Sequence, residues 1–127
     1  MADPSDVPFA HEPYISLETF KRDGTGVKTP VWAAPLDGTL VVMSAGAAYK
    51  VKRLRRDPRV RVAACDVRGK VRGEWKEGKG IVVLDPAHVE RAHAALRKKY
   101  GWQMAMGDFF ATLTGRVKKR AYLALTL

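Results

Sequence analysis

Short runs of alternating apolar and polar residues recur along the chain and predict β-strands. In the first run Ile15 and Leu17 share one face, as the two-residue period of a strand requires. Asp-Gly pairs at 23–24 and 37–38 supply the positive φ of hairpin turns, so the first three strands form an antiparallel meander. The second strand contains Pro30, which lacks an N–H donor and therefore predicts an edge, a bulge or a functional opening. The expected strands are residues 14–20, 27–34, 39–44 and 60–66, a pair of segments around 70–76 and 80–85, and residues 120–127.

A change to the helical period marks a helix within a basic stretch, residues 47–61. Ala47, Val51 and Leu54 fall on one apolar stripe of this helix and are expected to pack inward. Asp57-Pro58 ends the helix, because a residue that precedes proline is biased away from helical angles.

The longest expected helix begins at Asp85 and Pro86. Asp85 is a suitable N-cap and Pro86 suits the first helical position, while Gly101 ends the helix after a basic last turn. Residues 102–113 predict either a second short helix or an aromatic-lined loop. About six antiparallel strands with these helices predict one small β-barrel domain over residues 1–127, with an N-terminal arm at 1–13.

Charge narrows the range of partners. The chain has 23 Lys and Arg against 13 Asp and Glu, a net charge of +10, and the basic stretch alone carries seven cations and one acid. Such a field favours an anionic partner, which leaves three interpretations open: a solvated face, an anion site, or a nucleic-acid surface. Nucleic-acid modules usually place aromatics among their cations. Tyr49 is the only aromatic residue in the stretch, so nucleic acid is disfavoured.

Several other classes lack support in the sequence. No export signal or apolar run long enough to span a membrane is present, so the expectation is a cytoplasmic protein without a membrane partner. The single cysteine, Cys65, is expected to be a buried inert thiol. His11, His88 and His93 lack metal-ligand spacing, so no metal is expected. No nucleophile–base pair or matched carboxylate pair stands out, so hydrolytic chemistry is unsupported and catalytic residues stay unassigned.

One group of residues has the composition of a phosphate site. Ser44 ends the third expected strand, and the chain then enters the helix that carries Lys50 and Arg53 side by side on one flank. A hydroxyl, two cations and the unpaired N–H groups of a helix start are typical phosphate ligands. Lys28, at the start of the neighbouring strand, either reaches the same anion or is an ordinary exposed lysine.

Several segments resemble one known family. They are similar to the pyridoxamine-phosphate-oxidase-like split β-barrels, and specifically to their actinobacterial branch, which uses the deazaflavin coenzyme F-420. The similarity runs from about residue 14 onward. The segments that carry it are 25–32 (TGVKTPVW), 42–44 (VMS), 50–60 (KVKRLRRDPRV), 73–75 (GEW) and 97–102 (RKKYGW).

The resemblance implies a six-stranded antiparallel split β-barrel, mainly β with helices, that forms a homodimer with cofactor sites at the subunit interface. In the family, a basic residue at the start of the second strand, a hydroxyl at the end of the third and a basic residue in the next helix hold the cofactor phosphate. The corresponding residues here are Lys28, Ser44 and Lys50. Arg53 and Lys52 extend the anion site, and the deazaflavin ring is lined by Thr29, Pro30, Val31, Trp32 and Met43. Many relatives carry a polar Asp-Ser-Gly where this chain has 47–49 (AAY), so one hydroxyl that binds phosphate in them is missing here.

The implied function is that of an F-420-dependent reductase. The cofactor carries out the redox chemistry by delivering a hydride to a small electron-poor acceptor, and the protein holds and orients it. One alternative is an FMN-binding oxidoreductase of the same fold, since both cofactors share the phosphate site. The other is a non-catalytic basic protein that binds nucleic acid or a haem-like anion.

Overall fold

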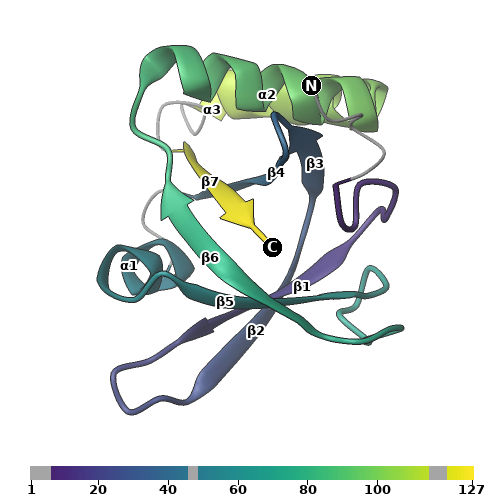
Figure 1. Cartoon of the computed structure of the whole chain (residues 1–127). Coiled ribbons are helices and arrows are strands. Elements are labelled where there is room, and N and C mark those ends of the chain that lie inside the picture. The colour runs from purple at the N-terminus through teal and green to yellow at the C-terminus, as the bar shows by residue number, and fades with distance from the viewer. Residues whose placement is uncertain (1–6, 46–48, 115–119) are drawn as a thin grey trace.

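A strongly curled antiparallel sheet forms the body of the protein (Figure 1). The computed structural model describes residues 7–45, 49–114 and 120–127. Its seven strands are β1 (Ile15–Phe20), β2 (Gly26–Val31), β3 (Ala33–Leu36), β4 (Thr39–Ala45), β5 (Arg59–Ala64), β6 (Lys76–Val82) and β7 (Arg120–Thr126). They are hydrogen-bonded in the order β2-β1-β5-β6-β7-β4-β3.

The two edge strands of this sheet, β2 and β3, are consecutive in the chain and are separated only by Trp32. Residues before Trp32 pair with β1, with Ile15 opposite Val31, and residues after it pair with β4, with Ala33 opposite Val42. A single bent segment therefore reaches both ends of the sheet and curls it into a barrel.

Tyr100 and Lys99 satisfy the backbone of the bend. The N–H of Ala33 donates to the Tyr100 hydroxyl oxygen at 3.0 Å, and the hydroxyl proton lies within reach of the carbonyl oxygens of Pro13 (2.9 Å) and Ala33 (3.1 Å). The Lys99 ammonium donates to the carbonyl oxygens of Glu12 (2.7 Å) and Ala33 (2.5 Å). A buried backbone group needs such a partner where the ladder is interrupted, so these two side chains make the bend possible.

The strand boundaries differ from the expected ones in three places. One is β6, which covers Lys76–Val82 where residues 80–85 were expected. The expected strand 27–34 is two strands, because Tyr100 takes the place of a ladder partner at the bend. Residues 70–75 form no strand, and in this segment only an isolated bridge joins Val71 to Cys65. Gly69 and Gly73 flank exposed charged residues there, a composition that disfavours strand pairing. The sheet thus has seven strands in the described residues where about six were expected.

The locally encoded turns and helix ends are confirmed. Gly24, Asp37 and Gly38 have φ values of 88°, 50° and 79°, as the two Asp-Gly turns require. The side chain of Asp85 accepts a hydrogen bond from the Ala87 N–H at 3.3 Å, and Gly101 ends the helix with φ 59°.

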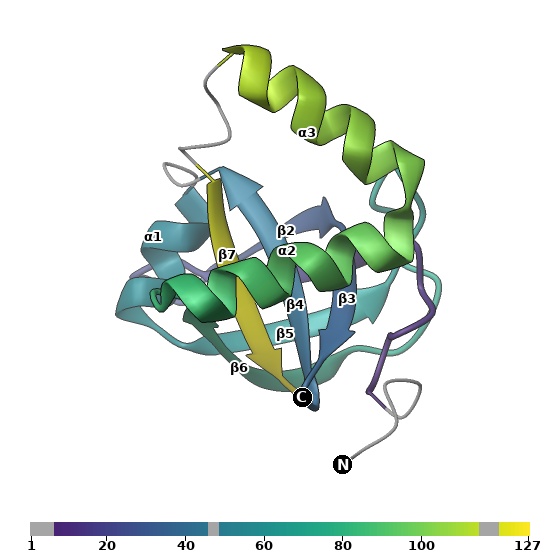
Figure 2. The ribbon, with the colours of Figure 1, turned by 90° about the horizontal axis from the view of Figure 1, so that it is seen from above.

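The described residues form three helices: α1 (Tyr49–Arg56), α2 (Pro86–Tyr100) and α3 (Trp102–Thr114). Helix α1 inserts Val51 and Leu54 into the barrel interior, as the apolar stripe predicts, although Ala47 lies outside the described residues. Helix α2 lies across β4 and β3, and α3 leaves its end at an angle (Figure 2). Residues 102–114 are therefore a helix, which decides between the two sequence-based alternatives. Among the described residues, none of the helices has the length and apolar character needed to cross a membrane.

Strand β4 is buried on both of its faces. Leu40 and Val42 belong to the barrel interior, whereas Val41 and Met43 face the second core cluster under α2. Because neighbouring residues of a strand point to opposite faces, Ser44 belongs to the interior face and Met43 to the face covered by α2.

We expect Leu54→Ala to loosen α1 from the barrel. Leu54 is 4% exposed, and its methyl groups lie against Gly80 of β6, where an added Cβ would meet them at 3.3 Å. Removing a buried leucine side chain lowers the free energy of unfolding by about 2–5 kcal/mol, which urea denaturation followed by circular dichroism will measure. Arg55→Ala, on the exposed face of the same helix, is the control and is expected to change the free energy of unfolding by less than about 0.5 kcal/mol. Equal effects of the two variants would contradict this account of α1.

Candidate functional site

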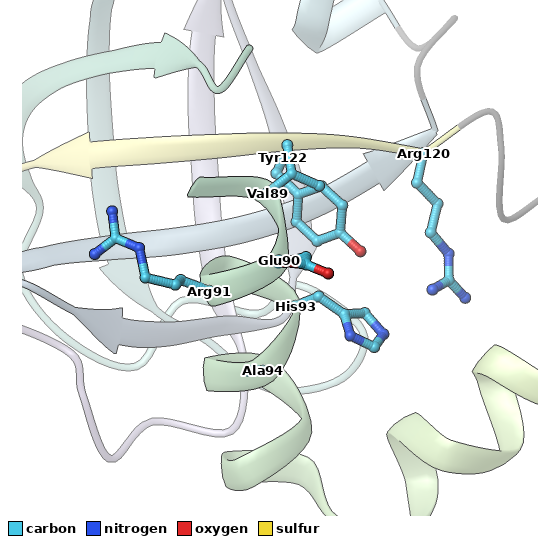
Figure 3. Close-up of a pocket in the computed structure, with 7 residues that line it drawn as sticks. All are labelled: Val89, Glu90, Arg91, His93, Ala94, Arg120 and Tyr122. Carbon is cyan, nitrogen blue, oxygen red and sulfur yellow. The ribbon is translucent and has the colours of Figure 1, made fainter. Parts of the chain in front are cut away.

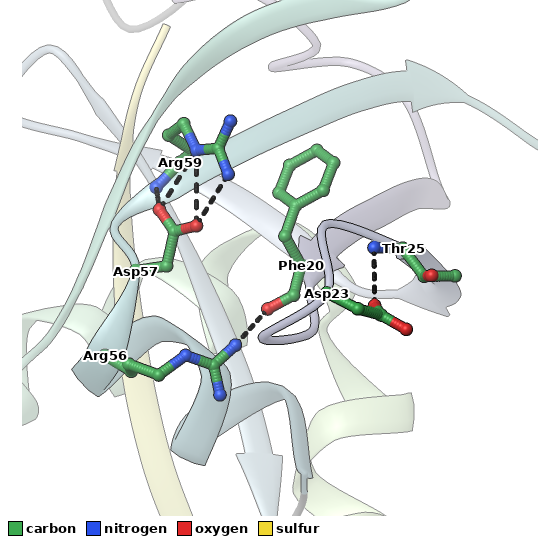
Figure 4. A network of polar contacts seen from close by, with 6 residues as sticks. All are labelled: Phe20, Asp23, Thr25, Arg56, Asp57 and Arg59. Atoms are coloured by element: carbon green, nitrogen blue, oxygen red, sulfur yellow. Dashed lines mark hydrogen bonds and ion pairs between the residues drawn. The ribbon is translucent and has the colours of Figure 1, made fainter.

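The seven cations of the basic stretch separate into paired and unpaired groups. Arg59 forms an ion pair with Asp57 at 2.9 Å (Figure 4), and Arg61 pairs with Glu18 at 3.1 Å. Arg56 donates to the carbonyl oxygen of Phe20 at 2.6 Å. Arg56 and Arg61 thus tie α1 and β5 to β1, whereas the Arg59–Asp57 pair stabilises the connection between α1 and β5.

Lys50 and Arg53 remain as a pair of neighbouring cations on one flank of α1. Arg53 donates to the hydroxyl of Thr19 at 3.3 Å, but neither Lys50 nor Arg53 has an ion pair with a described residue. Lys50 is half-buried, and this burial, followed by the nearby charge of Arg53, lowers its pKa. When a cation loses hydrating water and gains no carboxylate partner, the free-energy cost of desolvating its charge is poorly compensated. The side of α1 that carries Lys50 and Arg53, here called the Lys50 flank, is therefore suited to an external anion.

Ser44 lies at the end of β4, the strand that precedes α1. It is 8% exposed, stands on the interior face of the strand and is opposite Ala121 of β7. Residues 46–48 lie outside the described residues, so the Ala47-Ala48 departure from the family pattern cannot be placed in the structure. The strand end and the first turn of α1 are thus close in the chain, as the phosphate-site hypothesis requires.

A basic pocket of about 530 Å³ lies between α1 and the β1–β2 turn. All its described lining residues are cationic apart from Tyr49, whose ring has Lys52 at 5.4 Å and Arg53 at 5.9 Å from its centroid. The lining residues are Lys21, Arg22, Tyr49, Lys52, Arg53 and Arg56. No carboxylate from the described residues lines the pocket, so it is suited to a ligand with several negative charges.

Lys28 lies in a different group of side chains, on the exposed face of β2. Its ammonium is 5.1 Å from the centroid of the Trp75 ring, and the guanidinium of Arg61 is also 5.1 Å from that centroid. Arg61 in turn pairs with Glu18, which is 5% exposed and stands opposite Lys28 in the sheet. No hydrogen bond or ion pair among the described residues joins Lys28 to Ser44 or Lys50.

The residues expected to line the cofactor ring lie at the barrel bend. Thr29 and Val31 point inward from β2, whereas Pro30 is exposed and packs on Gly69. The Trp32 ring stacks on Tyr100, with centroids 4.3 Å apart and planes 7° apart.

Met43 and Trp32 both pack against the core cluster under α2, whereas Ser44, the neighbour of Met43, points to the other face of the strand. The expected site residues therefore lie on three separate surfaces, namely the Lys50 flank of α1, the Lys28 face of β2 and the Trp32–Met43 face under α2, and no hydrogen bond or ion pair among the described residues joins the three.

A polar cluster that sequence reasoning missed joins α2, α3 and β7. Asp108 of α3 lies 2.9 Å from the Nε2 atom of His93 and 2.5 Å from the guanidinium of Arg120. These residues are 15 and 12 positions apart, so no local spacing indicates the contact. Burial raises the pKa of Asp108, but the hydrogen bonds and charges of Arg120 and His93 outweigh it, and the net shift is downward.

The cluster borders a cavity of about 770 Å³ that Figure 3 shows from close by, with His93, Arg120 and the Tyr122 hydroxyl on one side. Tyr122 stands opposite Met43 in the sheet. The cluster thus adjoins the strand that carries Met43 and Ser44, and it fixes α3 against α2 and β7.

Comparison with solved structures identifies the fold. No protein-family model and no curated protein matches the sequence, but solved structures match the fold. A conserved hypothetical protein of Mycobacterium tuberculosis, Rv2991, has a TM-score of 0.70 and 23% identity over 98% of this chain and 79% of its own. A FAD-binding protein of Mesorhizobium loti has a TM-score of 0.58 and 20% identity over 95% and 82% of the two chains. A Listeria innocua protein described as a candidate pyridoxamine 5′-phosphate oxidase has a TM-score of 0.57 and 13% identity over 89% and 82%.

These similarities show that the chain has a split β-barrel fold of the kind found in flavin-binding and pyridoxamine-oxidase-like proteins. Haem-binding proteins also share the fold. A fold hosts many functions, so the similarity leaves the cofactor and the reaction to be argued from the site.

We expect Asp108→Asn to destabilise the protein at neutral pH, because it removes the carboxylate that pairs with the largely buried Arg120 side chain. Since the pKa of Asp108 is lowered from 3.8 in the folded protein, its contribution is present above that value and is lost as the pH falls through the lower folded-state pKa. Urea denaturation at pH 7 is expected to show a free energy of unfolding that is about 1–3 kcal/mol lower in the variant. In acid, the free energies of unfolding of the variant and the unmodified protein are expected to become equal. Asp37→Asn, which breaks an exposed pair with Arg91, is the control, with a loss below about 1 kcal/mol. A loss for Asp108→Asn that persists unchanged in acid would contradict this role.

Proposed function

We propose that the protein is a homodimeric reductase that binds coenzyme F-420, with its phosphate at the Lys50 flank of α1. The observation that carries the proposal is the pairing of half-buried Lys50 with Arg53 in the absence of any carboxylate partner among the described residues. FMN is the alternative cofactor, since it offers the same phosphate to the same residues.

The residues present fit a phosphate. An anion between Lys50 and Arg53 restores the interactions that burial removes from Lys50, and charge-assisted hydrogen bonds of this kind are the strong ones. The Ser44 hydroxyl is assigned to the same phosphate because β4 is the strand that precedes α1 in the chain. Lys28 is the third assigned ligand, and its engagement requires the ammonium to turn away from the Trp75 ring.

The basic pocket beside the flank favours F-420 over FMN. F-420 carries an oligoglutamate tail beyond its phosphate, whereas FMN ends at the phosphate. Arg53 belongs to both the Lys50 flank and the basic pocket, because it is the neighbour of Lys50 on α1 and lines the pocket together with Lys52. A chain of carboxylates that continues from the phosphate therefore meets a continuous row of cations.

The rest of the site orients the ring and the acceptor. When bound, the reduced deazaflavin supplies a hydride to an electron-poor acceptor. Thr29, Pro30, Val31, Trp32 and Met43 are assigned to the ring surface, and the stacking of Trp32 on Tyr100 holds that side chain in one orientation. A second subunit completes the site in this proposal, as in the proteins that the sequence resembles.

Lys50→Ala is expected to weaken F-420 binding. Loss of a charged hydrogen-bond donor to the phosphate removes about 1.5–3 kcal/mol, which is about a tenfold to hundredfold rise in Kd. Titration of the purified protein with F-420 at low salt, followed by cofactor fluorescence, measures this change. Arg55→Ala is the control, since it removes the same charge from the exposed face of the same helix. No saturable binding of F-420 or FMN would refute the proposal, and equal Kd values for the two variants would refute the assignment of Lys50.

The double variant Arg22→Ala/Lys52→Ala is expected to separate the two cofactors. It removes two cations of the basic pocket but leaves the Lys50 flank intact. We expect the Kd of F-420 to rise by about tenfold while that of FMN changes less than about threefold, because exposed charges contribute about 0.2–1 kcal/mol each. The difference is expected to shrink as ionic strength rises. An equal change for both cofactors would refute the assignment of the pocket to the tail, and a protein that purifies with flavin bound would favour FMN.

A further inference from the structure

A second pocket, of about 570 Å³, lies between α2, the β3–β4 turn and the N-terminal arm. Its size falls within the range of about 300–1,000 Å³ that is usual for small-molecule sites. Pro35, Leu36, Ala94 and Ala95 give it an apolar surface. None of the residues assigned to the cofactor lines this pocket, so it is a separate feature of the molecule.

Two lysines at the end of α2, Lys98 and Lys99, form the cationic side of the pocket. Neither lysine has an ion pair with a described residue. The only carboxylate among the described lining residues belongs to Asp37, and it is already paired with Arg91. The pocket therefore combines apolar walls with two lysines that form no ion pair with a described residue.

Lys99 has one donor left for a ligand. Its ammonium donates to two backbone carbonyl oxygens, those of Glu12 and Ala33, and an ammonium carries three N–H donors. Burial lowers the pKa of Lys99 to about 8, although the Glu12 carboxylate partly opposes the shift. A bound anion would favour the charged form and raise that pKa again.

We propose that this pocket binds a small amphiphilic carboxylate, with its carboxylate on Lys98 and Lys99 and its apolar part against Leu36, Ala94 and Ala95. The two lysines at one end account for the charge, and the apolar walls account for a hydrocarbon or aromatic body. This site does not depend on the proposed cofactor function.

Octanoate and its neutral counterpart octanol are suitable probes. We expect calorimetric titration of the full-length protein, below the critical micelle concentration of octanoate, to show saturable binding of octanoate and at least about tenfold weaker binding of octanol, as expected for loss of a charge-assisted contact. Affinity for octanoate is expected to fall as the pH rises through about 8, where Lys99 loses its charge. Equal binding of the two probes, or no binding of octanoate, would overturn the proposal.

Substitutions in the pocket lining that leave the bend at Ala33 intact test whether octanoate binds in this pocket. Lys99→Met is unsuitable because Lys99 holds the bend and the arm, whereas Lys98 is exposed. Lys98→Gln and the pocket-filling Ala94→Leu are each expected to weaken octanoate binding by about fivefold or more. Lys70→Gln is the control, since it removes one exposed cation elsewhere. Octanoate binding that Lys98→Gln and Ala94→Leu leave unchanged, or that F-420 displaces competitively, would overturn the assignment to this pocket.

Discussion

The hydrogen bonds from Tyr100 and Lys99 to the backbone at Ala33 are the interaction on which the rest of the structure depends. A sheet with β2 and β3 at its two edges closes only if the chain turns between them, and the turn leaves an N–H and a carbonyl without ladder partners. The last turn of α2 supplies both partners. Burial raises the pKa of Tyr100 to about 12, so its hydroxyl keeps its proton at any physiological pH and the bend stays satisfied.

The hydrogen bonds of Tyr100 and Lys99 at Ala33 also position three other parts of the molecule. They dock α2 on β3 and β4, they tie Glu12 and Pro13 of the arm to the barrel, and they turn Trp32 onto the Tyr100 ring. Trp32 of the proposed ring surface and Lys99 of the second pocket are therefore both held at this bend of the backbone.

The elements that the sequence predicts well are those whose cause is local. Asp-Gly turns, the Asp85 cap and the stop at Asp57-Pro58 each depend on neighbouring residues, and the structure has all of them. The bend at Trp32 and the Asp108 cluster depend on partners dozens or about a dozen residues away, so no period or spacing reveals them. For the site, the sequence identifies the cations, but only the fold distinguishes Arg59 and Arg61, which have carboxylate partners, from Lys50, which has none.

That distinction changes the meaning of the net charge of +10. Exposed cations such as Arg55 add to the field that attracts anions, but each contributes little to affinity because water and salt screen it. Lys50 and Lys99 are different, because burial disfavours their charged forms and neither forms an ion pair with a described residue. For Lys99, two backbone carbonyl oxygens and the charge of Glu12 offset part of this cost. A fold that leaves a half-buried ammonium without an ion pair is less stable than it would be with a paired one, and departures of this kind are concentrated at functional sites. The two proposals of anion binding therefore depend on these two lysines.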